Sequence, residues 1–173
     1  MIYYATQVHT GREQKFIDQV KQHLPEESSV QQFIFLRREL HVQRHGVMKN
    51  ELQPLFPGYV FLETDKELDP DSRSLIRESE YFYRFLKSNQ HVTPLCNSDL
   101  KILKHFMNFG EKAGPSQVYF DENERIVVVE GPLKGLEGFI IRIDRRKRRA
   151  KIRINFEDSP LIMDLAFDLI HKK

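Results

Sequence analysis

Hydrophobic and polar residues alternate along several short segments of the chain, which is the pattern of half-buried strands. Ile2 to Val8 alternates in this way, and Phe33 to Leu36 is a second short apolar run. The densest apolar run in the first half is Leu55 to Glu63, which contains Pro57 and Gly58. Because proline lacks an amide proton and glycine tolerates positive φ, we expect the chain to bend there before a strand begins.

Alternation within this run places large apolar side chains on both faces of the strand. Val60 and Leu62 lie on one face, while Tyr59 and Phe61 lie on the other. One face is therefore expected to cover a core, and the other to meet a second layer, another domain or a partner. An internal strand that is buried on both faces is the simpler alternative.

Helix signals occur between the expected strands. The segment from Thr10 to Glu13 fits a capping box, and Asp69-Pro70 is typical of a helix start. A third helix, with a broad apolar stripe, is expected from about Asn97. With a further aromatic strand at Tyr81 to Leu86, the order of elements predicts an α+β fold, with helices against an antiparallel sheet.

The chain changes character after residue 110. Glycine and proline among polar residues mark 111–120 as a linker. Short segments rich in Ile and Val follow, separated by a glycine-punctuated turn at Gly131 to Gly138. We therefore expect two domains, an α+β domain at 1–110 and a small β-barrel at 121–173.

One basic cluster dominates the charge distribution, although the formal net charge is only +2. If Ile152 and Ile154 face the barrel core, the residues between them face solvent and extend the positive tip of a hairpin. Closely spaced guanidinium groups suit phosphate oxygens, so this surface is a candidate nucleic-acid site; a solvated hairpin tip is the simpler alternative. The cluster consists of Arg142, Arg145, Arg146, Lys147, Arg148, Arg149, Lys151 and Arg153.

No residue pattern indicates catalysis. Cys96 is the only cysteine, which excludes a disulfide framework and a thiolate metal cluster within the chain. His41 and His45 are four residues apart, but their segment has no helical pattern, so we expect no metal. The glycines of the 131–138 turn lack the Lys-Ser/Thr that completes a phosphate-binding loop. We expect no enzyme activity, no cofactor, no membrane span and a cytoplasmic location.

Taken in order, these motifs resemble the NusG family of transcription elongation factors. The resemblance is carried by Tyr3 to Glu13, by the Phe-Pro-Gly-Tyr-Val element at Phe56 to Val60, and by the strand, Gly-Pro-x-x-Gly-x-x-Gly turn and strand between Val127 and Ile143. It implies an amino-terminal NGN domain, an antiparallel sheet flanked by helices, and a carboxy-terminal SH3-like KOW barrel.

The resemblance also implies partners. An NGN domain is expected to bind the clamp helices of the largest RNA polymerase subunit through an apolar groove, and the KOW barrel to recruit a ribosomal protein, the Rho terminator or RNA. The groove positions carried over to this sequence are Tyr4, Phe56, Pro57, Tyr59 and Phe61.

The basic cluster is richer in arginine than is typical of a housekeeping NusG. We therefore expect a monomeric, specialised paralogue similar to the LoaP antiterminators, whose KOW domain binds nucleic acid, most simply a structured hairpin of nascent RNA. A ribosome-associated RNA-binding protein without polymerase contact is the alternative function. The polar segment from Arg37 to Asn50 is expected to be a soluble hairpin tip or loop, with contact to DNA as an alternative.

One branch of the family, of the RfaH type, refolds its KOW domain as a helical hairpin. Here the segments Ile126 to Val129, Phe139 to Ile141 and Lys151 to Ile154 are dense in β-branched residues. Such residues lower helix propensity, so we predict a barrel throughout.

Overall fold

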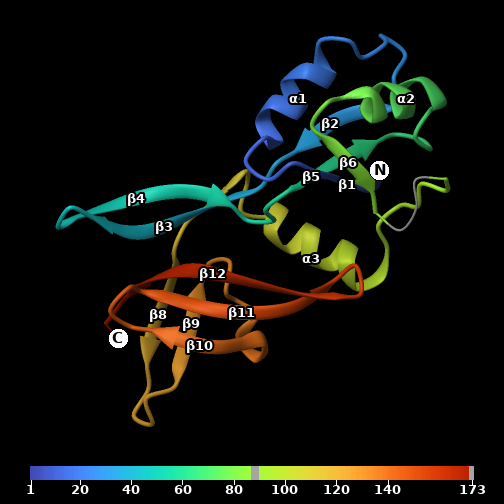
Figure 1. Ribbon diagram of the computed structural model, residues 1–173. Coiled ribbons are helices and arrows are strands. Elements are labelled where there is room, and N and C mark those ends of the chain that lie inside the picture. The colour runs from blue at the N-terminus through green and yellow to red at the C-terminus, as the bar shows by residue number, and fades with distance from the viewer. Residues whose placement is uncertain (87–89, 172–173) are drawn as a thin grey trace. The chain divides into compact units, whose positions relative to one another are not determined.

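The computed structural model describes residues 1–86 and 90–171 and divides the chain into two compact units. The first unit comprises Met1–Phe35 and Phe56–Lys101, and the second comprises Leu36–Leu55 and Ile102–Lys173. Figure 1 shows the elements of both units. The division does not follow chain order, because residues 36–55 leave the first unit and belong to the second.

The first unit is built on a four-stranded sheet with the strand order β2-β5-β1-β6. Each neighbouring pair is antiparallel. Together with its helices this confirms the predicted α+β fold. The strands are β1 (Ile2–Val8), β2 (Val30–Ile34), β5 (Tyr59–Thr64) and β6 (Phe82–Phe85); the helices are α1 (Glu13–Lys21), α2 (Pro70–Glu78) and α3 (Asn97–Met107), and α3 crosses the boundary between the units.

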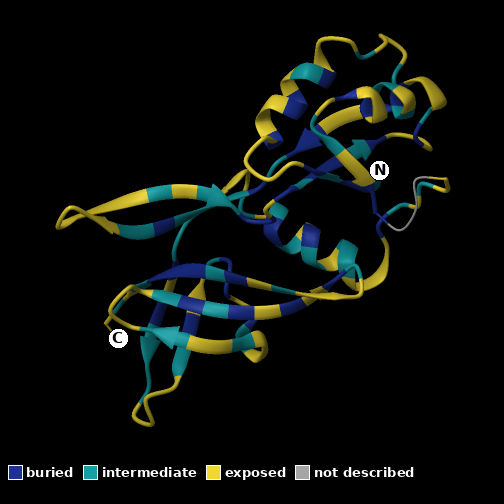
Figure 2. Cartoon of the chain, viewed as in Figure 1, coloured by how far each residue is buried: buried dark blue, intermediate teal, exposed yellow. Residues whose placement is uncertain are grey.

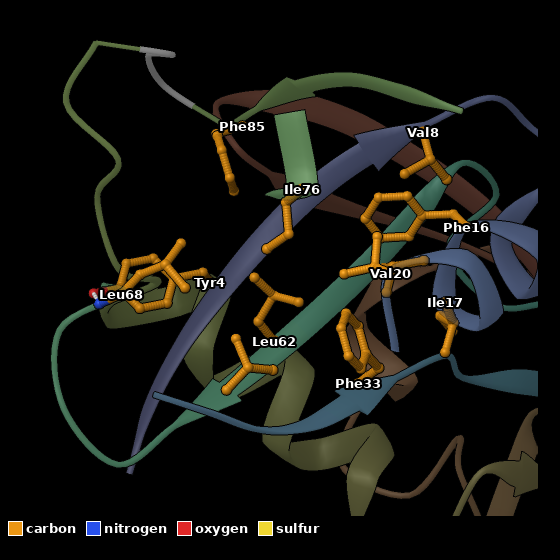
Figure 3. Packing of buried hydrophobic residues seen from close by; sticks show 12 residues of the cluster. Tyr4, Val8, Phe16, Ile17, Val20, Phe33, Leu62, Leu68, Ile76 and Phe85 are labelled. Atoms are coloured by element: carbon orange, nitrogen blue, oxygen red, sulfur yellow. Dashed lines mark hydrogen bonds between the residues drawn. The ribbon is translucent and has the colours of Figure 1, made fainter. Parts of the chain in front are cut away.

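One face of this sheet is covered by α1 and α2. Phe16 and Val20 of α1 are four residues apart and therefore share a helix face. They pack with Val60 and Leu62 of β5 and Ile76 of α2, and each of these side chains is at most 1% exposed (Figure 3). Full burial of such a side chain stabilises a fold by about 1.5–3 kcal/mol, so this cluster holds the helices on the sheet.

The start of α2 is as predicted. Asp69 Oδ1 accepts a hydrogen bond from the Ser72 amide at 2.8 Å, and Pro70 occupies the first turn. Asp69 Oδ2 accepts from the Ser29 amide at 2.9 Å and from its hydroxyl at 2.7 Å. Burial acts to raise the pKa of Asp69, but the hydrogen bonds from Ser29 and Ser72 outweigh it and hold this pKa well below its ordinary value.

The start of α1 differs from the predicted capping box. Arg12 is the N-cap, and no side chain caps the helix. The Glu13 carboxylate, only 2% exposed, instead accepts a hydrogen bond from the Gly58 amide at 2.8 Å, which satisfies the bend before β5. Gly58 has a φ of +80°, and a Cβ there would lie 3.0 Å from Thr10 Oγ1. The Thr10–Glu13 segment and the Pro-Gly bend are therefore built against each other.

The second unit contains a five-stranded sheet with the order β10-β11-β12-β8-β9. All neighbours are antiparallel except β12 and β8, which pair in parallel. Buried side chains of every strand except β10 fill its interior, which confirms the predicted small β-barrel. The elements are β8 (Ser116–Phe120), β9 (Ile126–Glu130), the 3₁₀ helix η1 (Glu137–Phe139), β10 (Ile140–Asp144), β11 (Arg149–Phe156) and β12 (Ser159–Leu169).

Two strands lie within 111–120, the segment that the sequence suggests is a linker. They are β7 (Lys112–Ala113) and β8. Val118 of β8 is fully buried, and the β-branched and aromatic residues around it favour a paired strand. Gly131 has a φ of +107°, and a Cβ there would meet the Ser116 backbone at 2.5 Å. The glycine-punctuated turn is thus packed directly on the start of β8.

The polar segment after Leu36 forms a long hairpin of β3 (Arg37–Arg44) and β4 (Val47–Pro54), with β7 parallel to β3. His45 and Gly46, both with positive φ, make the two-residue turn. The strands extend much further than the predicted tip or loop, because their pairing depends on a continuous backbone ladder rather than on apolar alternation. Most of β4 is exposed (Figure 2).

Candidate nucleic-acid interface

The basic segment forms the β10–β11 hairpin and its turn. Arg142 lies opposite Lys151, and Asp144 opposite Arg149. Asp144 Oδ1 accepts a hydrogen bond from the Lys147 amide at 2.9 Å. That bond, with the nearby positive charges of Lys147 and Arg142, lowers the pKa of Asp144. The single acid of the segment therefore fixes the turn, and the basic side chains surround it.

Strand β11 separates apolar from basic residues as predicted. Ala150, Ile152 and Ile154 are buried, whereas Lys151 is half-buried and Arg153 is exposed. The predicted positive face of this strand is confirmed.

Two residues of the cluster pair with Asp164 of β12. Lys151 Nζ lies 3.1 Å from Asp164 Oδ1, and Arg149 Nη1 lies 3.7 Å from Asp164 Oδ2. Arg149 Nη2 also donates to the His41 carbonyl of β3 at 3.0 Å. Because the Arg149 side chain is only 20% exposed, it is part of the framework of the second unit more than of its surface.

Two further residues of the cluster are also engaged. The Arg145 guanidinium lies 3.8 Å above the centre of the Phe120 ring and 2.7 Å from Glu124 Oε2. Arg148 Nη1 lies 3.8 Å from Asp168 Oδ1. Both arginines are half exposed, so these contacts orient them without removing them from the surface.

The other four side chains of the cluster are exposed and form no ion pair in the described part of the chain. A cation of this kind can bind an incoming anion without breaking an ion pair. We call them the free cations: Arg142, Arg146, Lys147 and Arg153.

Two hollows lie beside the free cations. The smaller, about 130 Å³, is surrounded by charged side chains only, and we call it the ionic hollow. The larger, about 360 Å³, lies between this turn and the β3–β4 hairpin, and we call it the hairpin hollow. The ionic hollow is lined by Arg142, Asp144, Lys147, Arg149, Lys151 and Asp164; the hairpin hollow is lined by His41, Val42, Gln43, Met48, Arg146, Lys147 and Arg149.

The β3–β4 hairpin is attached to the barrel through His41. Its Nε2 lies 3.1 Å from Asp168 Oδ1 of β12, and its Nδ1 lies 2.6 Å from Asn50 Oδ1 of β4. Both ring nitrogens therefore have partners, and β3 lies against β12. His45 is in the hairpin turn and exposed. Among residues 1–86 and 90–171, no group of three or more His, Cys, Asp or Glu side chains could hold a metal ion.

Two arginines of the β3–β4 hairpin are engaged within it. Arg38 Nη1 donates to the Pro54 carbonyl at 2.9 Å, and burial lowers the pKa of Arg38. Arg44 Nη2 pairs with Glu51 at 2.9 Å. These contacts account for two of the arginines that the sequence left as an alternative contact to DNA.

The five residues carried over as an exposed aromatic groove do not share one exposed surface, and that expectation needs correction. Tyr4 pairs with Leu62, so its ring lies in the helix-covered core, where its hydroxyl accepts from the Leu68 amide at 3.3 Å (Figure 3). Phe56 and Phe61 are at most 1% exposed. Only Pro57, which is exposed, and Tyr59, which is half-buried, present surface.

Phe56, Tyr59 and Phe61 nevertheless come together on the face of β5 opposite that core. The Phe56 and Phe61 rings meet edge to face with centroids 5.3 Å apart, and Tyr59 stacks on Phe61 at 6.5 Å. The bend brings Phe56 to this face, because the Tyr59 amide donates back to the Phe56 carbonyl at 3.1 Å. The stacked Phe61 ring, itself packed against Phe56, therefore fixes the position of the Tyr59 ring.

Two features beside the basic cluster have no clear motif in the sequence: the acidic residues of β12 and the β3–β4 hairpin. Asp164 and Asp168 are spaced as one face of a strand, and this was the available signal that β12 carries acids. Which cations they meet depends on the β11–β12 register, which the sequence does not state. The position of Gln43 and Met48 beside the basic turn depends on the packing of β3 against β12.

Comparison with known proteins places these features in context. The sequence model of the family described as Transcription termination factor nusG matches residues 1–104. The transcription termination/antitermination proteins NusG of Helicobacter pylori strain J99 and Thermus thermophilus are 25% and 23% identical to this chain. The alignments cover 99% and 95% of this chain and 98% and 95% of those proteins.

A solved structure gives the same result for the fold. It is described as "Domain interaction in Thermotoga maritima NusG" and matches with a TM-score of 0.57 at 19% identity. The match covers 94% of this chain and 92% of that chain. Within the described residues, no helix is both long and apolar enough to cross a membrane.

Proposed function

The chain belongs to the NusG family, and from this premise we propose that it is an antitermination factor that binds RNA polymerase through its first domain and structured nascent RNA through its barrel. The general role is supported by the family and by relatives named as termination/antitermination proteins. The proposed functional division is 1–110 and 121–173, with 111–120 between them, except that the β3–β4 hairpin lies in the same compact unit as the barrel. The family premise also supports a factor without catalytic activity of its own.

The observation that carries the RNA part is the set of four free cations, of which three line the two hollows and Arg153 lies on β11. When nucleic acid binds, arginine and lysine side chains without an acidic partner contact its phosphates and displace the counterions condensed on it. About four phosphate contacts correspond to a log–log salt slope of roughly −3 to −4 for a duplex. The paired members of the cluster, Arg149 and Lys151, hold the surface in shape.

The polymerase surface is proposed around the bend before β5. Pro57 is exposed and Tyr59 is half-buried, and the rings of Phe56 and Phe61 fix their positions. A rigid aromatic side chain that is only partly covered is a common centre of a protein interface. Tyr59→Ala is therefore expected to weaken polymerase binding while leaving RNA binding by the barrel unchanged.

The test is transcription through a terminator with purified polymerase, with and without the full-length protein. The protein is expected to increase run-through, and replacing all four free cations by alanine is expected to abolish the increase. A matched control removes four exposed cations of the first unit, Arg12, Lys15, Lys66 and Lys101, and should keep the increase.

Equal run-through for the two quadruple variants would contradict the proposed role of the basic surface. RNA binding without any effect on the polymerase would instead favour the ribosome-associated alternative. Fluorescence anisotropy with a labelled RNA hairpin separates these outcomes, because it measures RNA affinity without polymerase.

A further inference from the structure

Building on the proposed function, we propose that the ionic hollow and the hairpin hollow together bind one unpaired nucleotide, the phosphate in the first and the base in the second. The two hollows share Lys147 and Arg149, so they are adjacent. The ionic hollow is lined by charged side chains only, as suits a phosphate, whereas the hairpin hollow also has neutral and apolar side chains, as suits a base.

The ionic hollow suits a phosphate group. Four of the six side chains that line it are basic, and two of these, Arg142 and Lys147, are free cations. Its two acids already have donors: Asp144 accepts from the Lys147 amide, and Asp164 pairs with Lys151 and Arg149. The positive charge of Arg142 and Lys147 is therefore available to an anion.

The hairpin hollow suits a base. Gln43 of β3 and Met48 of β4 lie directly opposite each other on one face of the hairpin, and both are exposed. A thioether offers a polarisable surface to a ring face, and an amide can both donate to and accept from a base edge. Arg146 lines the same hollow, and a planar guanidinium stacks on bases. A volume of about 360 Å³ is ample for one nucleobase.

The junction between the hollows is fixed. Arg149 is held by the His41 carbonyl on one side and by Asp164 on the other. Its Nε is buried and has no hydrogen-bond partner among the described residues, so Arg149 acts here through its two terminal nitrogens. His41 has partners at both ring nitrogens, which makes it a positioning residue that keeps the β3–β4 hairpin beside the basic turn.

The nucleotide has to be unpaired. In a duplex each base is stacked on both faces and paired at its Watson–Crick edge, so Met48 could not stack on its ring and Gln43 could not bond to that edge. A bulged or single-stranded nucleotide exposes a face and an edge while its phosphate stays in the strand. The basic surface is thus expected to prefer a helix that carries a bulge over a continuous helix.

The experiment compares two RNA hairpins that differ only by one bulged nucleotide, using anisotropy with the full-length protein. We expect the bulged hairpin to bind about tenfold more tightly, the range of a single base-stacking contact. Met48→Ala and Gln43→Ala should each reduce this preference while leaving the affinity for the continuous hairpin unchanged. The salt slope of the Met48→Ala variant should also equal that of the unmodified protein, because no phosphate contact is removed.

Val47→Ala is the matched control, since Val47 is 55% exposed, as Met48 is at 56%, but lies on the opposite face of the hairpin. It should keep the preference for the bulge. Equal affinity for the two hairpins, or a preference that survives Met48→Ala, would overturn this inference alone. If the unmodified protein bound neither hairpin at low salt, the proposed function would be overturned as well.

A DNA version of the bulged hairpin identifies the source of the nucleotide. The same preference in DNA assigns recognition to the phosphate and base, and a preference confined to RNA adds a contact to the 2′-hydroxyl. A preference for the continuous helix in both versions would overturn the inference.

Discussion

Strands β5 and β11 are both interior strands of their sheets, but they use their faces differently. In β5, Val60 and Leu62 pack under the helices, and Phe61 on the other face is also fully buried. In β11, Ile152 and Ile154 are buried, whereas the basic residues Lys151 and Arg153 beside them reach the surface. Strand β5 therefore builds a core, and strand β11 builds a core on one side and a basic surface on the other.

The difference shows that an aromatic strand is a weaker sign of a binding surface than a strand with charged alternate positions. Burying a charged side chain without a partner costs several kcal/mol, so a run of arginines on one face has to remain near solvent. A run of aromatic residues carries no such constraint. Large apolar side chains on both faces of β5 were compatible with an open groove and with a buried layer, and Phe61 is fully buried.

The largest expected effect concerns Phe61. Phe61→Ala should lower the free energy of unfolding by about 3–5 kcal/mol, because it removes a fully buried ring from contact with Phe56 and Tyr59. Urea denaturation measures this. Tyr59→Ala, at a half-buried position, should cost about 1 kcal/mol. If both variants lowered the free energy of unfolding by a similar small amount, the Phe61 face of β5 would not be a buried layer, and the contrast with β11 would fail.

A smaller effect separates the roles of the basic residues on β11. Arg149→Met should lower the free energy of unfolding by about 1.5–3 kcal/mol, because it removes a charged hydrogen bond to the His41 carbonyl and an ion pair with Asp164. Arg153→Met on the same face is the control and should change stability by less than about 0.5 kcal/mol. Thermal unfolding of the full chain distinguishes them, and equal effects would contradict the framework role of Arg149.

A third prediction concerns how α2 is held over β5. Asp69→Ala should cost about 1 kcal/mol at neutral pH, since it removes the N-cap of α2 and the acceptor of Ser29. Because the pKa of Asp69 is lowered in the folded state, its contribution is present above the unfolded-state pKa of about 4 and is lost as the pH falls towards the folded value.

The measurement is urea denaturation of the two proteins at pH 7 and in steps below pH 4. The difference between them should shrink on acidification. A difference that grows on acidification would mean that the carboxyl group is not stabilised in its ionised form.

The smallest effect on stability accompanies a clear effect on binding. Arg153→Ala should leave the free energy of unfolding nearly unchanged and reduce the magnitude of the log–log salt slope for RNA binding by about one. Arg12→Ala, in the first unit, is the control and should leave the slope unchanged. An unaltered slope for Arg153→Ala would remove this residue from the binding surface.

Local signals predicted much of the fold. The β1 alternation, Asp69-Pro70 and the Ile152/Ile154 pattern can each be read within a few neighbouring residues, so the sequence is sufficient to place a strand, a helix start and a basic face. The Thr10–Glu13 segment failed as a capping box for the opposite reason. Its carboxylate has a better partner at Gly58, a donor 45 residues away in the chain.

The sequence by itself determined the family, the two kinds of fold and the position of the basic cluster. Motifs, hydrophobic periodicity and charge are local properties of short segments, so they can be identified without knowing how the segments pack. Only the tertiary structure decided which cations are free, since that depends on the register that brings Asp164 to Lys151 and on the packing that brings His41 to Asp168. It also decided that Tyr4 and Phe61 lie on opposite faces of one sheet, because strand pairing, and not residue type, sets the direction of each ring.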